Sequence, residues 1–212
     1  HGQMLMFTYP LQGNYGVSGD DFQSKQMWPK AMVCREYWDN PTHHRLDRTL
    51  NQFLIDEGKP GICGVDTRML TLKVRNQGVM KATLAVSDEK DSAGIDVVQM
   101  ARSLPDISLQ DLLGDVTCPE PYHIKGPGPR IAMIDLGIKS NILKSLSARG
   151  FDIHVLPAYA SISDIEAVSP DALFLSNGPG DPERAHKAID AVKQFAWQVP
   201  VFGICLGHQI IS

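Results

Sequence analysis

In the second half of the chain, short apolar segments alternate with segments whose apolar residues recur at helical spacing. The apolar segments have the length of buried strands and lie at residues 131–136, 152–156, 171–175 and 200–204. Strands that alternate with helices predict a parallel sheet that is covered on both faces. The sequence therefore predicts an α/β domain over residues 130–212.

Three helices are expected between these strands. The first is amphipathic, and its apolar face is formed by Ile142, Leu143 and Leu146. The second is short and begins with Ser163 and Glu166, which have the spacing of a capping box. The third is expected over about residues 183–197.

The first half has shorter, more mixed segments and predicts a small α+β domain over residues 1–117. Its expected elements are a strand at 4–9, a strand at 30–36, a helix at 46–57, a helix from Asp66 or Thr67 to about Gly78, and a strand at 79–86. Residues 118–129 hold four prolines and two glycines, and they are expected to be a linker between the domains.

The composition is that of an ordinary globular protein and excludes several classes. Of the 212 residues, 43% are hydrophobic and 21% are charged, and the net charge of −4 offers no basic surface for nucleic acid. The sequence has no apolar run long enough for a membrane span. The four cysteines are far apart and form no C-x-x-C pair, which disfavours a zinc knuckle and a disulfide scaffold.

The two ends of the sequence indicate a fragment. The chain begins at His1, and it stops at Ser212 inside an expected helix that has barely begun. A helix cut there would lose most of its apolar face and its backbone hydrogen bonds. We therefore expect the first domain to lack its start and the second to lack its carboxyl-terminal part.

The sharpest chemical feature is a G-x-C-x-G motif after the last expected strand, formed by Gly203, Cys205 and Gly207. It is the cysteine version of a nucleophile elbow, a tight strand-to-helix turn that pushes the central side chain out at the carboxyl edge of the sheet. The helix N-terminus favours the thiolate, and the Leu206 amide is placed to donate to an oxyanion. A buried, inert cysteine is the usual alternative, but the flanking glycines disfavour it.

A second feature, Asn177-Gly-Pro-Gly-Asp-Pro182, follows the preceding expected strand. Ligands of open α/β sheets bind at this edge. Gly178 and Gly180 could present bare backbone N–H groups to an anion or to a tetrahedral oxygen. The alternative is an ordinary turn, in which glycine and proline are common. If the strand before this loop lies next to the strand before Cys205, a role in ligand binding is favoured over an ordinary turn.

Both features resemble class I, triad-type glutamine amidotransferases, through LSNGPGDP (175–182) and PVFGICLGHQ (200–209). The first half is similar to the amino-terminal domain of carbamoyl phosphate synthetase small subunits, through FTYPLQGNYG (7–16) and VDTRMLT (65–71). IDLGIKSNIL (134–143) resembles the first strand and helix of that subunit's amidotransferase domain. The resemblance covers essentially the whole chain. It implies a small mixed domain followed by a truncated, flavodoxin-like amidotransferase domain.

The resemblance also implies roles for individual residues. Cys205 would attack the side-chain carboxamide of glutamine, form a glutamyl thioester and release ammonia. Leu206 and Gly178 would supply backbone oxyanion donors, and Gly180 and Gln209 would help to hold the glutamine. The family's catalytic His and its acidic partner would lie beyond Ser212, and a serine that contacts glutamine would lie before His1, so residues 1–212 alone are expected to be inactive.

Partners and cofactors follow from the same resemblance. The chain would be the glutaminase part of a ligase and would deliver ammonia through a channel to a large synthetase subunit. That subunit would use ATP, magnesium and bicarbonate, whereas no cofactor or metal is expected on this chain. The protein would be cytoplasmic, with no nucleic-acid or membrane partner, and would serve arginine or pyrimidine synthesis.

Several alternatives stay open beside this interpretation. The chain could be an amidotransferase partner in anthranilate or GMP synthesis, although its amino-terminal half argues against that. It could instead be a non-catalytic interaction subunit. His208 is a tempting base for Cys205, but we interpret it as a structural residue because it lies three positions along the same expected helix.

The remaining polar residues are interpreted as structural. The other histidines, namely His43, His44, His123, His154 and His186, show no metal-ligand spacing along the sequence. Asp66, Thr67 and Arg68 predict a helix cap rather than an anion site. Asp135 follows a strand, but no G-x-G-x-x-G follows it, so a dinucleotide site is not expected.

Overall fold

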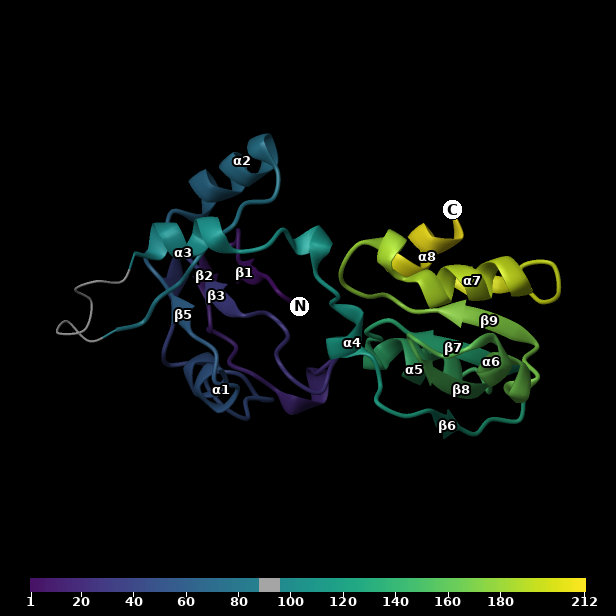
Figure 1. Ribbon diagram of the computed structural model, residues 1–212. Helices are drawn as coiled ribbons and strands as arrows, with labels where there is room; N and C mark the ends of the chain where they lie inside the picture. The colour runs from purple at the N-terminus through teal and green to yellow at the C-terminus, as the bar shows by residue number, and fades with distance from the viewer. Residues whose placement is uncertain (88–95) are drawn as a thin grey trace. The chain divides into compact units, whose positions relative to one another are not determined.

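The computed structural model describes residues 1–87 and 96–212 (Figure 1). The described chain divides into two compact units, His1–Asp106 and Ile107–Ser212. No helix in the described part combines the length and the apolar character that a membrane span requires.

The first unit is a mixed α+β structure with small parallel sheets. Strands β1 (Met4–Met6), β3 (Ala31–Val33) and β5 (Gly61–Ile62) form one sheet in the order β1-β3-β5. Strands β2 (Leu11–Gln12) and β4 (Glu36–Tyr37) form a second, two-stranded sheet. A short 3-10 turn, η1, covers Gly19–Asp21.

The helices of the first unit begin at side-chain caps. Helix α1 (Leu50–Asp56) begins after Thr49, α2 (Thr67–Gln77) after Asp66, and α3 (Val97–Ser103) after Asp96. The Asp66 carboxylate accepts a hydrogen bond from the Met69 amide at 2.9 Å, so this residue is the predicted helix cap.

The prediction of a strand at 79–86 is wrong, because these residues pair with none of the described strands. Val79 and Val86 are each more than three-quarters exposed. β-Branched residues favour a strand only where a partner and a packing surface are available.

The second unit is built on one five-stranded sheet with the order β10-β9-β7-β8-β6. Its parallel strands are β7 (Arg130–Asp135), β8 (Asp152–Pro157), β9 (Ala172–Leu175) and β10 (Val201–Gly203). Across the sheet the parallel strands lie in the order β8-β7-β9-β10. Numbered along the chain, this is the order 2-1-3-4 of the flavodoxin-like arrangement. The predicted parallel α/β fold is therefore confirmed.

The predicted linker at 118–129 is wrong, because it contains a strand of this sheet. Strand β6 (Tyr122–Ile124) pairs antiparallel with β8 at the edge. The division between the two units lies at Asp106 and Ile107, not at residue 117. Prolines flank β6 on both sides, and edge strands tolerate them there because one row of their backbone groups needs no partner.

Helices cover both faces of the sheet. Helix α5 (Ser140–Ser147) packs over Ile131 and Met133, whereas α6 (Ile162–Val168), α7 (His186–Phe195) and α8 (Leu206–Ile211) pack over the face that carries Ala132 and Ile134. Figure 1 shows α7 and α8 beside β9, with β6 at the far edge of the sheet. Shorter turns are η2 (Ile107–Leu109), α4 (Leu113–Val116) and η3 (Pro182–Arg184).

Two helix starts differ from the prediction. The capping box of α6 uses Ser161 and Asp164, not Ser163 and Glu166. The helix expected over 183–197 is divided into η3 and α7. Asp181 caps η3 and Pro182 occupies its first position, so the chain makes one tight turn before α7 begins.

Candidate active site

The two predicted site segments lie side by side at the carboxyl edge of the sheet. Strands β9 and β10 are parallel neighbours, and Leu175 is paired with Gly203. Beyond the strands, the Ile204 amide donates to the Leu175 carbonyl at 3.1 Å, and the Gly207 amide donates to the Ser176 carbonyl at 3.1 Å. The structure thus brings the loop after β9 against the turn that carries Cys205.

Cys205 has the backbone geometry of a nucleophile elbow. It lies between β10 and α8 with φ 52° and ψ −110°, and only one other non-glycine residue in the described chain, Ser169, has a positive φ. Such a conformation costs of order 1–3 kcal/mol and persists only where the surrounding structure enforces it. The side chain is exposed, as the elbow hypothesis requires.

The glycines around Cys205 are required by close backbone contacts. A Cβ atom at Gly207 would lie 2.3 Å from the Leu175 carbonyl oxygen, and one at Gly203 would lie 2.4 Å from the Gly207 carbonyl carbon. Both contacts are with backbone, so no side-chain rotation could relieve them. The sharp turn from strand to helix therefore depends on glycine at these two positions.

Side chains that the sequence analysis missed hold the loop after β9. The buried Ser176 hydroxyl accepts a hydrogen bond from the Leu136 amide at 2.9 Å. The Asn177 side chain donates to the Gly137 carbonyl at 2.9 Å and accepts from the Lys139 amide at 3.2 Å. The signal was present in the sequence as a polar pair directly after a buried strand, but its partners lie 38 to 40 residues away.

Gly178 is pressed against the loop that follows β7. A Cβ atom there would lie 2.1 Å from the Leu136 carbonyl oxygen. Gly180 has φ +91°, a conformation that favours glycine. The Gly-Pro-Gly turn is therefore shaped by backbone packing at one glycine and by backbone conformation at the other.

Three backbone N–H groups at this edge are free to bind a ligand. Within residues 1–87 and 96–212, the amides of Gly178, Gly180 and Leu206 donate to no protein acceptor. The Leu206 side chain is buried in the core, which fixes the residue after Cys205 in position. Gln209 is exposed one turn further along α8, and its amide donates to the Cys205 carbonyl at 3.0 Å.

No base is in place beside the thiol in the described part of the chain. The Cys205 sulfur has no hydrogen-bond partner there, and the exposed His208 ring makes no hydrogen bond with it. Nucleophilic catalysis by cysteine needs a base within hydrogen-bond reach. Residues 1–87 and 96–212 therefore hold the Cys205 thiol in an exposed turn without a hydrogen-bonded base.

The other cysteines differ from Cys205 in environment. Cys34 and Cys118 are buried, and burial raises the pKa of both thiols, that of Cys118 to about 11. The negative charge of Asp135 adds to the effect at Cys118. Cys63 is exposed, but it lies next to β5 in the first unit, away from any elbow.

Asp135 has a structural role, in agreement with the sequence analysis. Its buried carboxylate accepts hydrogen bonds from the amides of Gly137, Ile138 and Cys118 at 2.8–2.9 Å. These three bonds shape the loop after β7 and tie it to the segment before β6. Both carboxylate oxygens therefore hold backbone in place.

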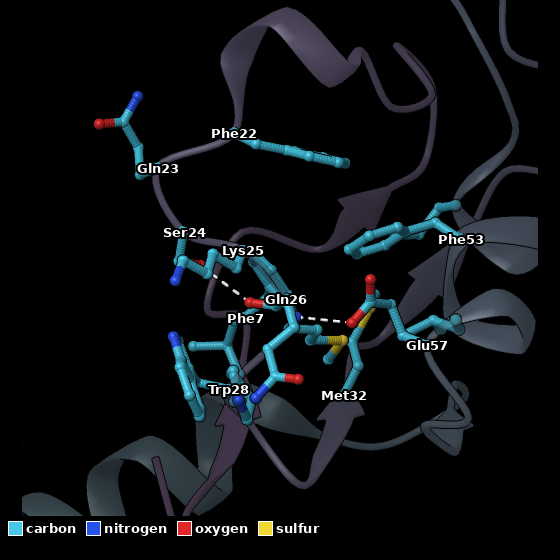
Figure 2. A pocket seen from close by; sticks show the side chains of 15 residues that line it. Phe7, Phe22, Gln23, Ser24, Lys25, Gln26, Trp28, Met32, Phe53 and Glu57 are labelled. Atoms are coloured by element: carbon cyan, nitrogen blue, oxygen red, sulfur yellow. Dashed lines mark hydrogen bonds between the residues drawn. The ribbon is translucent and has the colours of Figure 1, made fainter. Parts of the chain in front are cut away.

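A cavity of about 280 Å³ lies in the first unit and contains none of the predicted site residues. Its lining is mostly apolar, with the rings of Phe22 and Phe53 on one side and Glu57 among the few charged groups (Figure 2). The Glu57 carboxylate accepts a hydrogen bond from the Met27 amide at 2.7 Å, so its charge already serves the fold.

Two of the histidines lie together in space, although no metal-ligand spacing relates them along the sequence. His123 and His154 lie on neighbouring strands, and their ring nitrogens lie within 4.8 Å of a carboxylate oxygen of Asp152 and of each other. The spacing is invisible along the sequence because antiparallel pairing of β6 with β8 creates it.

Comparison with known proteins agrees with the two-part organisation. Residues 1–84 match the family described as carbamoyl-phosphate synthase small chain, CPSase domain, and residues 132–212 match glutamine amidotransferase class-I. Similar curated proteins named carbamoyl phosphate synthase small chain come from Methanosarcina acetivorans (50% identical), Caldanaerobacter subterraneus (43%) and Methanopyrus kandleri (40%).

The whole chain takes part in each of these alignments, and it spans 56–59% of the length of these three relatives. The two domain matches cover separate parts of the chain, and the full-chain alignments bring both parts into relatives of one name. The chain is similar over its whole length to carbamoyl phosphate synthase small chains, and its second half matches the class-I glutamine amidotransferases.

Proposed function

We propose that this protein hydrolyses glutamine as the small chain of a carbamoyl phosphate synthase, with Cys205 as the nucleophile. The observation that carries the proposal is the strained, exposed cysteine at the end of β10, next to three unpaired backbone N–H groups. Related proteins that are named carbamoyl phosphate synthase small chains support it.

The reaction begins when the Cys205 thiolate attacks the side-chain carbonyl carbon of glutamine. The carbonyl π electrons move to oxygen, and the amides of Leu206 and Gly178 donate to the resulting oxyanion. One donor of this kind is worth about 3 kcal/mol of barrier. Gly180 and Gln209 hold the rest of the glutamine at the rim.

Collapse of the tetrahedral intermediate breaks the carbon–nitrogen bond. The leaving nitrogen takes up the proton that the base removed from the thiol, and ammonia departs. Water then attacks the glutamyl thioester, which gives glutamate and restores the thiol. The proposal requires a base that residues 1–87 and 96–212 do not place beside Cys205, and a histidine of the complete protein would have the required chemistry.

The ammonia would pass to a large synthetase subunit, which would bind ATP, magnesium and bicarbonate and make carbamoyl phosphate. No cofactor would be needed on this chain. The complex would be cytoplasmic and would supply arginine or pyrimidine synthesis.

A glutamine-analogue diazo-ketone tests the nucleophile in the protein as its gene encodes it. We expect one label per chain, on Cys205, protected by glutamine and absent from Cys205→Ala. Cys63→Ala, which removes the other exposed thiol, is the matched control and should be labelled like wild type. Equal labelling of Cys205→Ala would contradict the assignment.

A second assay separates catalysis from a purely interacting role. The reconstituted complex should make carbamoyl phosphate from glutamine or from ammonia, and Cys205→Ala should retain only the ammonia-dependent reaction. Failure of wild type to use glutamine would instead favour a non-catalytic partner subunit.

A further inference from the structure

A group of two imidazoles and one carboxylate lies at the edge of the sheet, far from Cys205. In the antiparallel pair of β6 with β8, His123 lies directly opposite His154. Asp152 precedes His154 by two residues, so both side chains project from the same face of β8. One ligand atom from each residue lies within 4.8 Å of the other two.

The side chains of this group already converge. The Nε2 atom of His123 lies 2.6 Å from Oδ1 of Asp152, and Nε2 of His154 lies 3.3 Å from Oδ2. The two rings are stacked, with centroids 3.9 Å apart and planes 19° from parallel. Each imidazole thus directs its Nε2 atom at one oxygen of the same carboxylate.

We propose that His123, Asp152 and His154 bind a zinc ion. Two imidazole nitrogens and a carboxylate oxygen are a common three-residue set for Zn²⁺, with water as the fourth ligand. The side chains are 34%, 15% and 26% exposed in the order just given, which leaves water access to the fourth position. The cation replaces the protons that now link the rings to the carboxylate.

Of the neighbours of Asp152, one orients its carboxylate for a cation and another repels a cation. The Gly126 amide donates to Oδ1 at 3.2 Å, which orients the carboxylate as outer-shell donors do in metal sites. Arg130 places Nε 3.4 Å from Oδ2, and its Nη1 is anchored on the Val168 carbonyl at 2.8 Å. The Arg130 charge therefore weakens cation binding, and its removal should strengthen it.

The position of the site indicates a structural role. The ligands come from β6 and from the first residues of β8, whereas Cys205 follows the last residue of β10 at the other edge of the sheet. A metal here joins the edge strand β6, which has only three residues, to its single neighbour. The proposal is thus independent of glutamine hydrolysis.

Zinc titration of the protein as its gene encodes it, with exposed thiols first alkylated, tests the proposal. The wild type should bind Zn²⁺ with a saturable rise in melting temperature. His154→Gln and His123→Gln should each weaken binding at least about tenfold, because loss of even an outer-shell partner costs about 10–100-fold in metal affinity. Arg130→Gln should bind Zn²⁺ more tightly than wild type, which a merely hydrogen-bonded cluster would not produce.

The adjacent pair His43 and His44 supplies the control, because their rings also lie close together, at 4.3 Å, in the first unit. His43→Gln should leave zinc affinity unchanged. Circular dichroism shows whether each variant is folded, and the two histidine variants serve as independent tests if one is not. Zinc affinity of either variant within twofold of wild type, or no zinc-dependent stabilisation of wild type, would overturn the proposal.

Discussion

Replacement of Gly207 by alanine should destabilise the second unit, although alanine is the better helix former. Gly207 lies in α8, where alanine alone would gain up to about 1 kcal/mol over glycine. The new Cβ atom would lie 2.3 Å from the Leu175 carbonyl oxygen, whereas ordinary contact begins at 3.4 Å. The backbone of β9 or of the elbow must therefore move.

That movement has a second cost. The Leu175 carbonyl also accepts the Ile204 amide at 3.1 Å, so its displacement weakens the hydrogen bond that starts the elbow, worth about 1 kcal/mol. Overpacking of this kind costs about 1–3 kcal/mol. After the helix gain is subtracted, Gly207→Ala should lose about 2 kcal/mol, which lowers the melting temperature by roughly 8 °C or more for a unit of this size.

Gly114→Ala is the matched control for thermal unfolding. Gly114 is also helical, in α4, but its Cβ atom would meet nothing nearer than the Tyr159 hydroxyl at 3.6 Å. This variant should melt at or above the wild-type temperature. If Gly207→Ala were as stable as Gly114→Ala, the claim that backbone contact requires glycine at the elbow would be refuted.

Three further predictions concern thiol reactivity, loop support and turnover. At pH 8, iodoacetamide should modify the exposed Cys63 and Cys205 but spare Cys118, because burial raises the pKa of the Cys118 thiol from 9.0 to about 11 and makes its thiolate about a hundredfold scarcer. Mass spectrometry should find Cys118 modified only as the pH approaches 11. Modification of Cys118 at pH 8 would contradict its burial. Ser176→Ala should cost about 1–3 kcal/mol in urea unfolding because it strips the buried Leu136 amide of its acceptor, and an unchanged midpoint would show that another group takes over. Purified residues 1–212 should release no glutamate above background, since no base among the described residues forms a hydrogen bond with the Cys205 thiol; Cys205-dependent release would refute this.

The sequence predicts the four parallel strands of the second unit well because apolar residues dominate each of them and each connection between them is helical. The periodicity fails where tertiary pairing decides the outcome. The apolar residues at 79–86 find no partner among the described strands, and the proline-rich stretch at 118–129 supplies β6 because β8 offers an open edge. Neither outcome can be predicted from the residues of the segment alone, because each depends on whether a neighbouring strand is available.

The candidate site shows the same division. The elbow at Cys205 and the Gly-Pro-Gly turn are local motifs, and both were predicted from their residues. Ser176 and Asn177 were missed as supports because their partners lie in the loop after β7. The pair His123 and His154 was missed because only the register of two antiparallel strands brings these residues together.

The most direct test of the central claim is to trap the thioester. The protein as its gene encodes it, mixed with radiolabelled glutamine and quenched in acid, should carry glutamate-derived label on the peptide that contains Cys205. Cys205→Ser should carry none, whereas Cys63→Ser should match wild type. Label that persists in Cys205→Ser, or that maps to another cysteine, would contradict the assignment of Cys205 as the nucleophile.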